Sequence, residues 1–202
     1  MISHQASARP KGGLTAGASP VNGTLVPVLI RAARPQDLPT LPGIESAAGA
    51  AFADIGMIEI ANDADPTVAE LSRYQQAGRA WVAVDDTDTP VAYLIAEVVD
   101  GGLHIEQVSV HPRWAHQGVG RALIDESARW AAGQGLASLT LTTFANVPWN
   151  APYYLRCGFV IVPEALLSPG LREIRRAEAA RGLDAWPRVC MSRPVRANGE
   201  VQ

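Results

Sequence analysis

Alternation between apolar and polar positions divides the chain into short strands and amphipathic helices. The strand-like runs are apolar or β-branched, and each ends at a cluster of Asp, Gly, Asn or Pro residues, which favour turns. Hairpin signals at 85–88 and 100–102 predict an antiparallel meander in the middle of the chain. The predicted strands are Val28–Ile30, Ala80–Val84, Pro90–Val99, Leu103–Val110, Leu136–Thr143, Phe159–Val162 and Arg188–Met191, the last as an edge strand.

Apolar residues spaced three and four apart predict helices between these strands. The predicted helices are a stretch after Asp37, Thr67–Ala77, Gly118–Ala132, Asn150–Arg156 and Pro169–Arg181. Pro at a helix start and Gly at its stop mark several of these boundaries. The order of elements predicts an α/β fold: a single mixed, mostly antiparallel central sheet flanked by helices.

Composition changes along the chain predict its organisation. Residues 1–25 are rich in Gly, Ser, Ala and Pro and have little to bury, so we expect a flexible leader there. One α/β domain is expected over 26–165. A C-terminal helix and strand extension over 166–202 could cover part of that domain or form a homodimer contact.

The overall composition is that of an ordinary globular protein. Of the 202 residues, 48% are hydrophobic and 18% charged, and the net charge is −3. This charge gives no general attraction to nucleic acid or to an anionic membrane. No apolar run approaches the ~20 residues of a membrane span, and the N-terminus lacks the order of a signal peptide. We therefore expect a soluble, cytoplasmic protein whose two cysteines are buried, reduced thiols.

The most informative segment is the glycine-rich sequence Gln117–Gly120, which opens a predicted helix after the strand that ends at Val110. Helix N-termini present unpaired N–H groups, and glycines allow a ligand close to the backbone, so the segment is suited to a phosphate. A dinucleotide fold requires a third glycine where Leu123 stands. A P-loop requires a lysine, and Lys11 is the only one in the chain.

Two segments resemble a known family. Val108–Leu123, VSVHPRWAHQGVGRAL, resembles the acyl-CoA-binding motif of the GNAT superfamily of N-acyltransferases. Asn150–Phe159, NAPYYLRCGF, resembles the family's second signature. The order of elements resembles the family fold over about Val26–Val162. The resemblance implies an N-acetyltransferase that uses acetyl-CoA as co-substrate and an amine as acceptor.

The resemblance also implies which residues contact the cofactor. The backbone of Val108–Val110 would pair with the pantetheine arm, and the loop amides would hold the pyrophosphate. The residues expected to bind CoA are Val108, Ser109, Val110, His116, Gln117, Gly118, Val119, Gly120, Arg121 and Asn150. The family usually has Gln or Arg where Ala115 stands; because the loop contributes backbone N–H groups, binding should survive, with Arg113 or Arg121 serving that position in part.

The acceptor amine must lose a proton before it attacks, since a free alkylamine has a pKa of about 10.4. Glu106 is the candidate base, because strand alternation would place it with His104 and Val108 on one face. His104 is the second choice, and the alternative for each is a strand residue without a catalytic role. Tyr154 stands where the family places the acid that protonates the leaving thiolate; its alternative is a packing aromatic. Tyr153 is interpreted as structural.

Other chemistries lack their sequence signals. His111 and His116 have no zinc-ligand spacing, so no metal is expected, and the serine-hydrolase Gly-x-Ser-x-Gly motif is absent. Helix 171–181 is expected to present a solvated, ion-paired face. Trp149 could line a substrate pocket or belong to the core. Acidic residues at 54–65 would suit a cationic acceptor.

Three functions remain open at this point. The leading hypothesis is acetyl transfer to a small primary amine by direct attack in a ternary complex. The alternatives are a non-catalytic acyl-CoA-binding sensor and an N-acetyltransferase that acts on proteins or peptides. The presence of both Glu106 and Tyr154 favours an enzyme.

Overall fold

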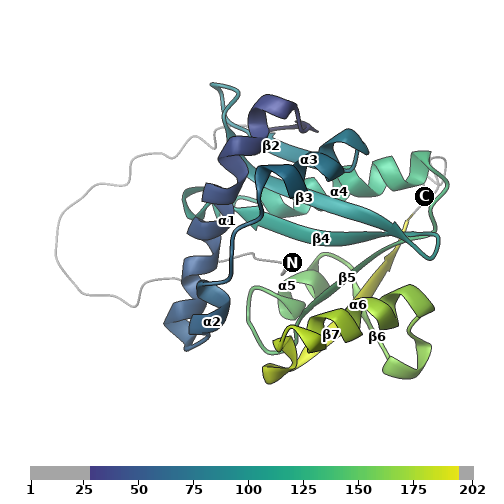
Figure 1. Cartoon of the computed structure of the whole chain (residues 1–202). Coiled ribbons are helices and arrows are strands. Elements are labelled where there is room, and N and C mark those ends of the chain that lie inside the picture. Colours follow the sequence, from purple (N-terminus) through teal and green to yellow (C-terminus); the bar gives the residue numbers. More distant parts are fainter. Residues whose placement is uncertain (1–27, 196–202) are drawn as a thin grey trace.

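The computed structural model describes residues 28–195, and a seven-stranded sheet organises them (Figure 1). The strand order is β1-β2-β3-β4-β5-β7-β6, and every neighbouring pair is antiparallel except β4 and β5. The strands are β1 (Leu29–Ala32), β2 (Ala80–Val84), β3 (Pro90–Val99), β4 (Gly102–Val110), β5 (Ser138–Phe144), β6 (Val160–Val162) and β7 (Arg188–Pro194). The predicted mixed, mostly antiparallel sheet is confirmed. The predicted leader lies outside the described residues.

Six α-helices accompany the sheet in residues 28–195. They are α1 (Leu41–Gly49), α2 (Ile58–Ala61), α3 (Val68–Gln76), α4 (Val119–Gly133), α5 (Ala151–Arg156) and α6 (Pro169–Ala180). Local sequence explains their starts: Thr67 caps α3 and exchanges hydrogen bonds with Glu70 in a capping box. The 3₁₀ segments Pro35–Thr40 and Ala50–Ile55 flank α1, so the predicted helical stretch after Asp37 is a succession of short helices.

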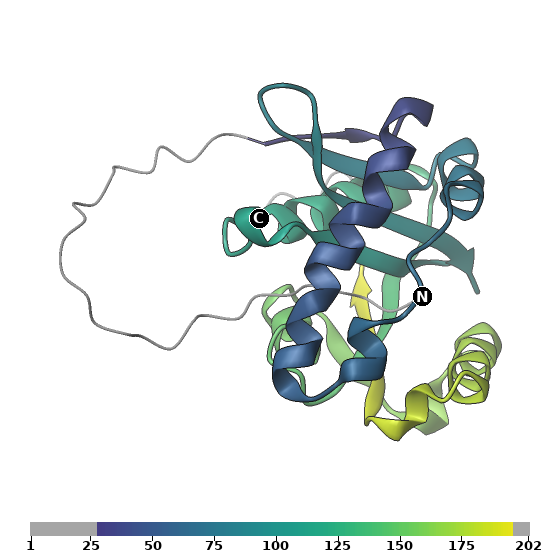
Figure 2. The same cartoon turned by 60° about the vertical axis from the view of Figure 1, so that its left-hand side comes forward.

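The helices cover both faces of the sheet (Figures 1 and 2). On one face, Leu123 and Ile124 of α4 pack with Leu94, Ile105 and Val108 of the strands. On the other face, residues of α1 and α3 pack against β2 and β3. This second cluster contains Leu41, Ile44, Leu71, Tyr74, Val82, Tyr93 and Ile95. Because both faces are covered, β2, β4 and the central part of β3 are almost entirely buried, as their apolar sequences require.

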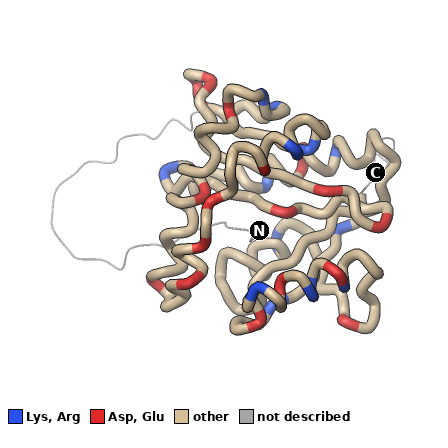
Figure 3. Tube along the Cα trace, in the orientation of Figure 1, with Lys and Arg blue, Asp and Glu red and all other residues tan. Residues whose placement is uncertain are grey.

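The helix α6 lies over the β5–β7 part of the sheet and is only partly the solvated face that its charges predicted. Figure 3 shows positive and negative residues alternating along it. Arg176 and Glu173 form an exposed pair, with 3.0 Å between their charged atoms. Glu178, in contrast, is buried and pairs at 2.6 Å with Arg188 of β7, whose side chain is 0% exposed. The buried ion pair between Glu178 and Arg188 therefore holds α6 against β7 of the sheet.

The strand β7 was predicted at an edge, and that prediction was wrong. It pairs with β5 on one side and with β6 on the other, and β6 is the edge strand. Its register with β5 runs without a break from Ser138↔Pro194 to Phe144↔Arg188. The reason is topological. β5 pairs with β4 on one side, and its other side is free until β7, which comes later in the sequence, pairs with it.

Two further expectations concern cysteines and membranes. Cys157 and Cys190 are both free and buried, as predicted, and burial raises the pKa of each thiol, that of Cys190 to about 11. Within residues 28–195, none of the helices has the length and apolar character needed to cross a bilayer.

Candidate active site

The N-terminus of α4 presents backbone N–H groups to a loop, as the glycine-rich sequence predicted. The loop enters the helix through two residues with left-handed backbone, His116 (φ 61°) and Gly118 (φ 80°). The first bond inside the helix runs from the amide of Ala122 to the carbonyl oxygen of Gly118, at 3.0 Å. The amides before Ala122 are therefore not needed by the helix ladder, and they can bind an anion.

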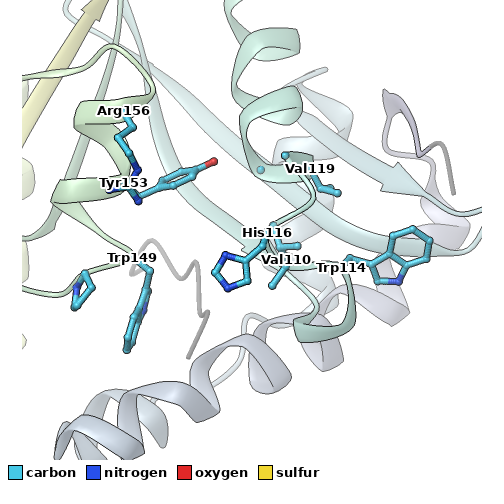
Figure 4. A pocket seen from close by; sticks show the side chains of 11 residues that line it. Val110, Trp114, His116, Val119, Trp149, Tyr153 and Arg156 are labelled. Atoms are coloured by element: carbon cyan, nitrogen blue, oxygen red, sulfur yellow. The ribbon is translucent and has the colours of Figure 1, made fainter. Parts of the chain in front are cut away.

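These residues form one wall of a cavity of about 370 Å³, shown in Figure 4. The opposite wall is the segment that leads into α5. The residues that line the cavity are Val110, Trp114, Ala115, His116, Gly118, Val119, Gly120, Pro148, Trp149, Tyr153 and Arg156. The walls are mostly apolar, with a helix N-terminus at one side and a guanidinium at the other. That combination suits a long ligand with an apolar arm and a phosphate group.

The sheet opens beside this cavity. The parallel strands β4 and β5 pair only from Leu103↔Leu139 to Ile105↔Leu141. Past Ile105, β4 stays paired with β3 as far as Val110, but its register with β5 ends. The backbone of β4 from 106 to 110 therefore faces the opening with its N–H and C=O groups on the side that β5 has left. An extended polar chain could add to the strand there.

The predicted alternation of β4 was wrong at this point. The register passes from Ala96↔Ile105 to Ile95↔Gln107, so Glu106 is the extra residue of a β-bulge. As a result Ile105 and Val108 share the α4 face, while Gln107 and Ser109 are hydrogen-bonded to each other on the α1 face. Val108 thus does not share a face with His104.

The bulge places Glu106 between two covering elements. The charge of its half-buried carboxyl group helps to raise the pKa of Tyr74 of α3. The charges of Glu97, Glu178 and Arg181 in turn affect the pKa of Glu106. Burial is the main cause that raises the pKa of Glu106, and the charges of Glu97 and Glu178 add to it. A carboxylate with a raised pKa is a better proton acceptor at neutral pH than an ordinary one.

His104, the second choice for the base, is placed differently. It is 1% exposed, and its Nδ1 lies 3.0 Å from the hydroxyl oxygen of Thr140. Burial lowers the pKa of His104 to about 4. Its imidazole is therefore neutral at pH 7 and bonded to β5, away from the opening. Of the two candidates, only Glu106 lies past the last β4–β5 pair, where the two strands separate.

The helix α5 brings both tyrosines of the second motif to the site. Tyr154 is 0% exposed and packs at 5.7 Å, between ring centroids, on Phe159. It belongs to the apolar cluster that also holds Val108 and Val110 of the diverging strand. Tyr153, interpreted from the sequence as structural, lines the cavity, and Figure 4 shows its hydroxyl directed toward Val119. The helical pattern alone did not separate these roles, because adjacent residues on a short helix both meet neighbours.

The structure divides the other residues expected to bind CoA into two groups. Val110, His116, Gly118, Val119 and Gly120 line the cavity. The remaining ones lie around it: Val108 and Ser109 are buried in β4, the Gln117 amide donates to the Arg113 carbonyl at 3.1 Å, Arg121 donates to the Arg156 carbonyl at 3.3 Å, and the buried Asn150 amide donates to Thr143 at 2.7 Å.

Two residues that line the cavity carry polar groups of particular interest. The sequence reading did not single out Arg156, whose guanidinium lies 5.9 Å from the ring centroid of Tyr153. The indole N–H of Trp149 is buried and has no hydrogen-bond acceptor among the described residues, and its side chain packs on Phe52 at a centroid distance of 5.6 Å. A buried donor without an acceptor is uncommon in a folded protein, and a ligand carbonyl would satisfy it.

No group of three or more His, Cys, Asp or Glu in residues 28–195 lies close enough together to hold a metal ion. The polar groups at the cavity are thus backbone amides, one guanidinium, one phenol, one imidazole and an indole. These are groups that bind and orient an anionic ligand and its carbonyl oxygens.

Comparison with known proteins agrees with this geometry. The sequence profile of the acetyltransferase (GNAT) family matches residues 51–159. Among solved structures, the ribosomal-protein-S18-alanine N-acetyltransferase from Escherichia coli has a TM-score of 0.58 at 19% identity, over 87% of this chain and 98% of its own. Ard1 from Thermoplasma volcanium has a TM-score of 0.60 at 18% identity, over 84% and 98%.

A third structure, Rv2747 from Mycobacterium tuberculosis, has a TM-score of 0.61 at 20% identity, over 83% of this chain and 99% of its own. At these identities the likeness concerns the fold. The family profile covers more than half of the chain, from the 3₁₀ segment Ala50–Ile55 through the glycine-rich loop and α5 to Phe159. The chain therefore belongs to the GNAT family of acetyltransferases and is an N-acetyltransferase.

Proposed function

We propose that this enzyme moves an acetyl group from acetyl-CoA to a primary amine by direct attack in a ternary complex. The observation that carries the proposal is the opening of the sheet between β4 and β5 next to the free amides of α4. Rv2747, which shares this fold, was solved in complex with CoA. Acetyl-CoA supplies the thioester, and the residues described here would bind and orient it.

Each part of the cavity suits a part of acetyl-CoA. The amides of Gly118, Val119 and Gly120 would hold the pyrophosphate, where the helix macrodipole adds partial positive charge. Arg156 would add a cation at the other wall. The backbone of β4 beyond Ile105 would pair with the pantetheine arm, and the Trp149 indole N–H offers a donor to one of its carbonyl oxygens.

The catalytic roles follow from position and acidity. Glu106 would take a proton from the acceptor nitrogen, and Tyr154 would protonate the departing thiolate. A thiol has a pKa near ~8.5 and a phenol near ~10, so this transfer is not strongly mismatched. Two observations support these roles: Glu106 stands just past the last β4–β5 pair, and Tyr154 of α5 belongs to the same apolar cluster as Val108 and Val110 of β4.

A small, cationic acceptor agrees best with the surroundings of Glu106. The segments that flank it are joined: Arg181 pairs with Asp63 at 3.4 Å, and Leu183 packs with Phe52 and Met57. These contacts join the α2 region to the segment between α6 and β7, and such a closed arrangement would suit a small acceptor better than a folded protein. The carboxyl groups nearby favour a positively charged amine.

The test begins with calorimetric titration of the full chain with acetyl-CoA, with NADH as the control ligand. Saturable binding of acetyl-CoA alone is expected. Thiol release is then followed with a panel of cadaverine, tyramine and an alanine-terminated hexapeptide. Release with the amines and not the peptide supports the proposal. Failure of acetyl-CoA to bind would sink it, and release with the peptide alone would replace the acceptor class.

A Gly118→Ala variant is expected to bind acetyl-CoA about tenfold more weakly. A side chain at φ 80° costs about 1–2 kcal/mol, and relief of that strain would turn the loop amides away from the pyrophosphate. The matched control is Gly133→Ala at the other end of α4, where the backbone is ordinary and nothing lies within 4 Å. Equal affinity of the two variants for acetyl-CoA would count against the role of the loop.

A Tyr154→Phe variant is expected to lower kcat by about ten- to a hundredfold, with the affinity for acetyl-CoA little changed. The loss is moderate because the thiolate is itself a stable leaving group near neutral pH. Tyr153→Phe is the control, since Tyr153 lines the cavity from the same helix. Stopped-flow detection of thiol release measures both, and a larger kcat loss in Tyr153→Phe would reverse the assignment.

A further inference from the structure

A chain of buried polar side chains runs from β4 to α1 on the acceptor face of the sheet. Tyr93, Gln107 and Ser109 are each 0% exposed, and Glu45 of α1 is 9% exposed. Tyr93 and Ser109 stand opposite each other in the β3–β4 register. Four polar side chains together in a protein core are costly unless they are hydrogen-bonded.

The hydrogen bonds that connect these four side chains all run in one direction, from β4 toward α1. The Gln107 amide donates to the Ser109 hydroxyl oxygen at 2.8 Å, and Ser109 is hydrogen-bonded to the phenol of Tyr93. Tyr93 in turn donates to Oε2 of Glu45. Because each donor points toward α1, the chain ends on the Glu45 carboxyl group and fixes its orientation.

This hydrogen-bonded series begins at Gln107, on the part of β4 that is proposed to pair with the pantetheine arm. Gln107 and Ser109 flank Val108, beyond the last β4–β5 pair at Ile105, where the backbone faces the proposed pantetheine position. Glu45 is the member nearest the surface. The hydrogen-bonded series therefore links a second carboxyl group, that of Glu45, to the strand that also carries Glu106.

The proposed reaction requires more than one proton acceptor. An acceptor that arrives as an ammonium ion loses one proton before attack and a second as the amide forms. The N–C bond forms, the C–S bond breaks with its electron pair on sulfur, and the thiolate takes a proton from Tyr154. Two protons thus leave the nitrogen and one is supplied to sulfur, so one proton is released to solvent per turnover.

We propose that Glu45 receives the second of these protons, and that Tyr93 is a positioning residue that orients the Glu45 carboxylate. This inference rests on the proposed function and on Glu106 as the first acceptor. After turnover both carboxyl groups return their protons to solvent, and Tyr154 regains one.

The acidity of Glu45 makes the proposal measurable. Burial raises the pKa of Glu45 to about 7, the hydrogen bond from Tyr93 lowers it, and the negative charges of Asp65 and Asp63 raise it. Among residues 28–195, Tyr93 faces Glu45 from β3, and the two aspartates act on it from the segment between α2 and α3. A group that must be ionised gives activity that falls as pH drops through its pKa.

The experiment measures kcat from pH 5.5 to 9.5 for the full chain, with saturating acetyl-CoA and the best amine of the panel. Wild type is expected to lose activity below about pH 7. Glu45→Gln should lower kcat about a hundredfold and remove the part of the pH dependence that Glu45 causes, leaving only that of Glu106. Tyr93→Phe removes a donor to the carboxylate, so its step should move to higher pH, and kcat at pH 9.5 should stay below that of wild type because the carboxylate is no longer oriented. Asp65→Asn removes a like charge, so its step should move to lower pH.

Opposite shifts in Tyr93→Phe and Asp65→Asn would not arise from a merely structural role, which lowers activity equally at every pH. Carbon-13 NMR titration of labelled glutamate carboxyls gives the same shifts without turnover. A Glu45→Gln variant that keeps the wild-type step and kcat within twofold would overturn the proposal and leave the acetyltransferase function intact. Absence of thiol release by wild type with every member of the panel would instead overturn both.

Discussion

A Glu106→Gln variant is expected to lose about 10²- to 10⁴-fold in kcat, the range over which a positioned proton acceptor contributes. Glutamine keeps the size of the side chain and its place in the bulge, but it cannot take a proton from the acceptor nitrogen. The affinity for acetyl-CoA, measured by calorimetry, should not change, because Glu106 is not among the residues that line the cavity proposed to bind it. Steady-state thiol release at pH 8 measures the loss.

Glu97→Gln is the matched control for this variant. Glu97 is a neighbouring carboxyl group on β3 that already pairs with Arg79 at 2.6 Å. Its removal should leave kcat at pH 8 within about twofold. Its negative charge contributes to the raised pKa of Glu106, so the variant should also keep more of its activity at mildly acidic pH. If Glu97→Gln and Glu106→Gln lose equal activity, the negative charge around Glu106 causes the loss, and Glu106 is not the base.

An Arg188→Met variant is expected to lose about 3–5 kcal/mol of stability, which corresponds to about 6–20 °C in Tm for a domain of this size. Arg188 donates at 2.6 Å to Oε1 of Glu178 and lies 4.7 Å above the ring of Phe144. Its removal leaves Glu178 buried with only Arg175 and Thr142 as partners. Urea denaturation monitored by tryptophan fluorescence measures the change.

The double variant Arg188→Met, Glu178→Leu separates a lost ion pair from lost packing. Replacing both charges with apolar side chains removes the uncompensated carboxylate, so most of the stability should return. Burial opposes ionisation of Glu178, but Arg188 and its other partners lower its pKa overall. Stability from this group is therefore present above its unfolded pKa and lost on acidification in the wild type. A double variant as unstable as the single one would assign the effect to packing.

Much of the fold could be predicted because local signals and tertiary contacts agree. The turn at 100–102 and the apolar runs on either side predict the β3–β4 hairpin, and Gly118 predicts the start of α4. The glycine-rich loop was located in the same way, since its function depends on backbone geometry that the sequence states directly. These are short-range features, and neighbouring residues decide them.

The rest depends on contacts between residues far apart in sequence. The bulge at Glu106 is a property of two strands together, so strict alternation along β4 alone put Val108 on the wrong face. The cavity residue Arg156 and the chain that ends at Glu45 likewise arise where separate elements meet. No periodicity within α1 distinguishes a carboxyl group that meets Tyr93 from one that faces water.

The position of β7 has a consequence for synthesis on the ribosome. The cavity proposed to bind acetyl-CoA is built from residues up to Arg156, yet β5 and β6 both depend on β7 for an antiparallel partner. A nascent chain that has emerged only as far as α5 can form the β1–β4 meander, but β5 still has an open edge. Such an edge recruits other strands. Translation must reach Pro194 before the sheet closes, so premature termination within 157–187 should give aggregated chains and no truncated enzyme.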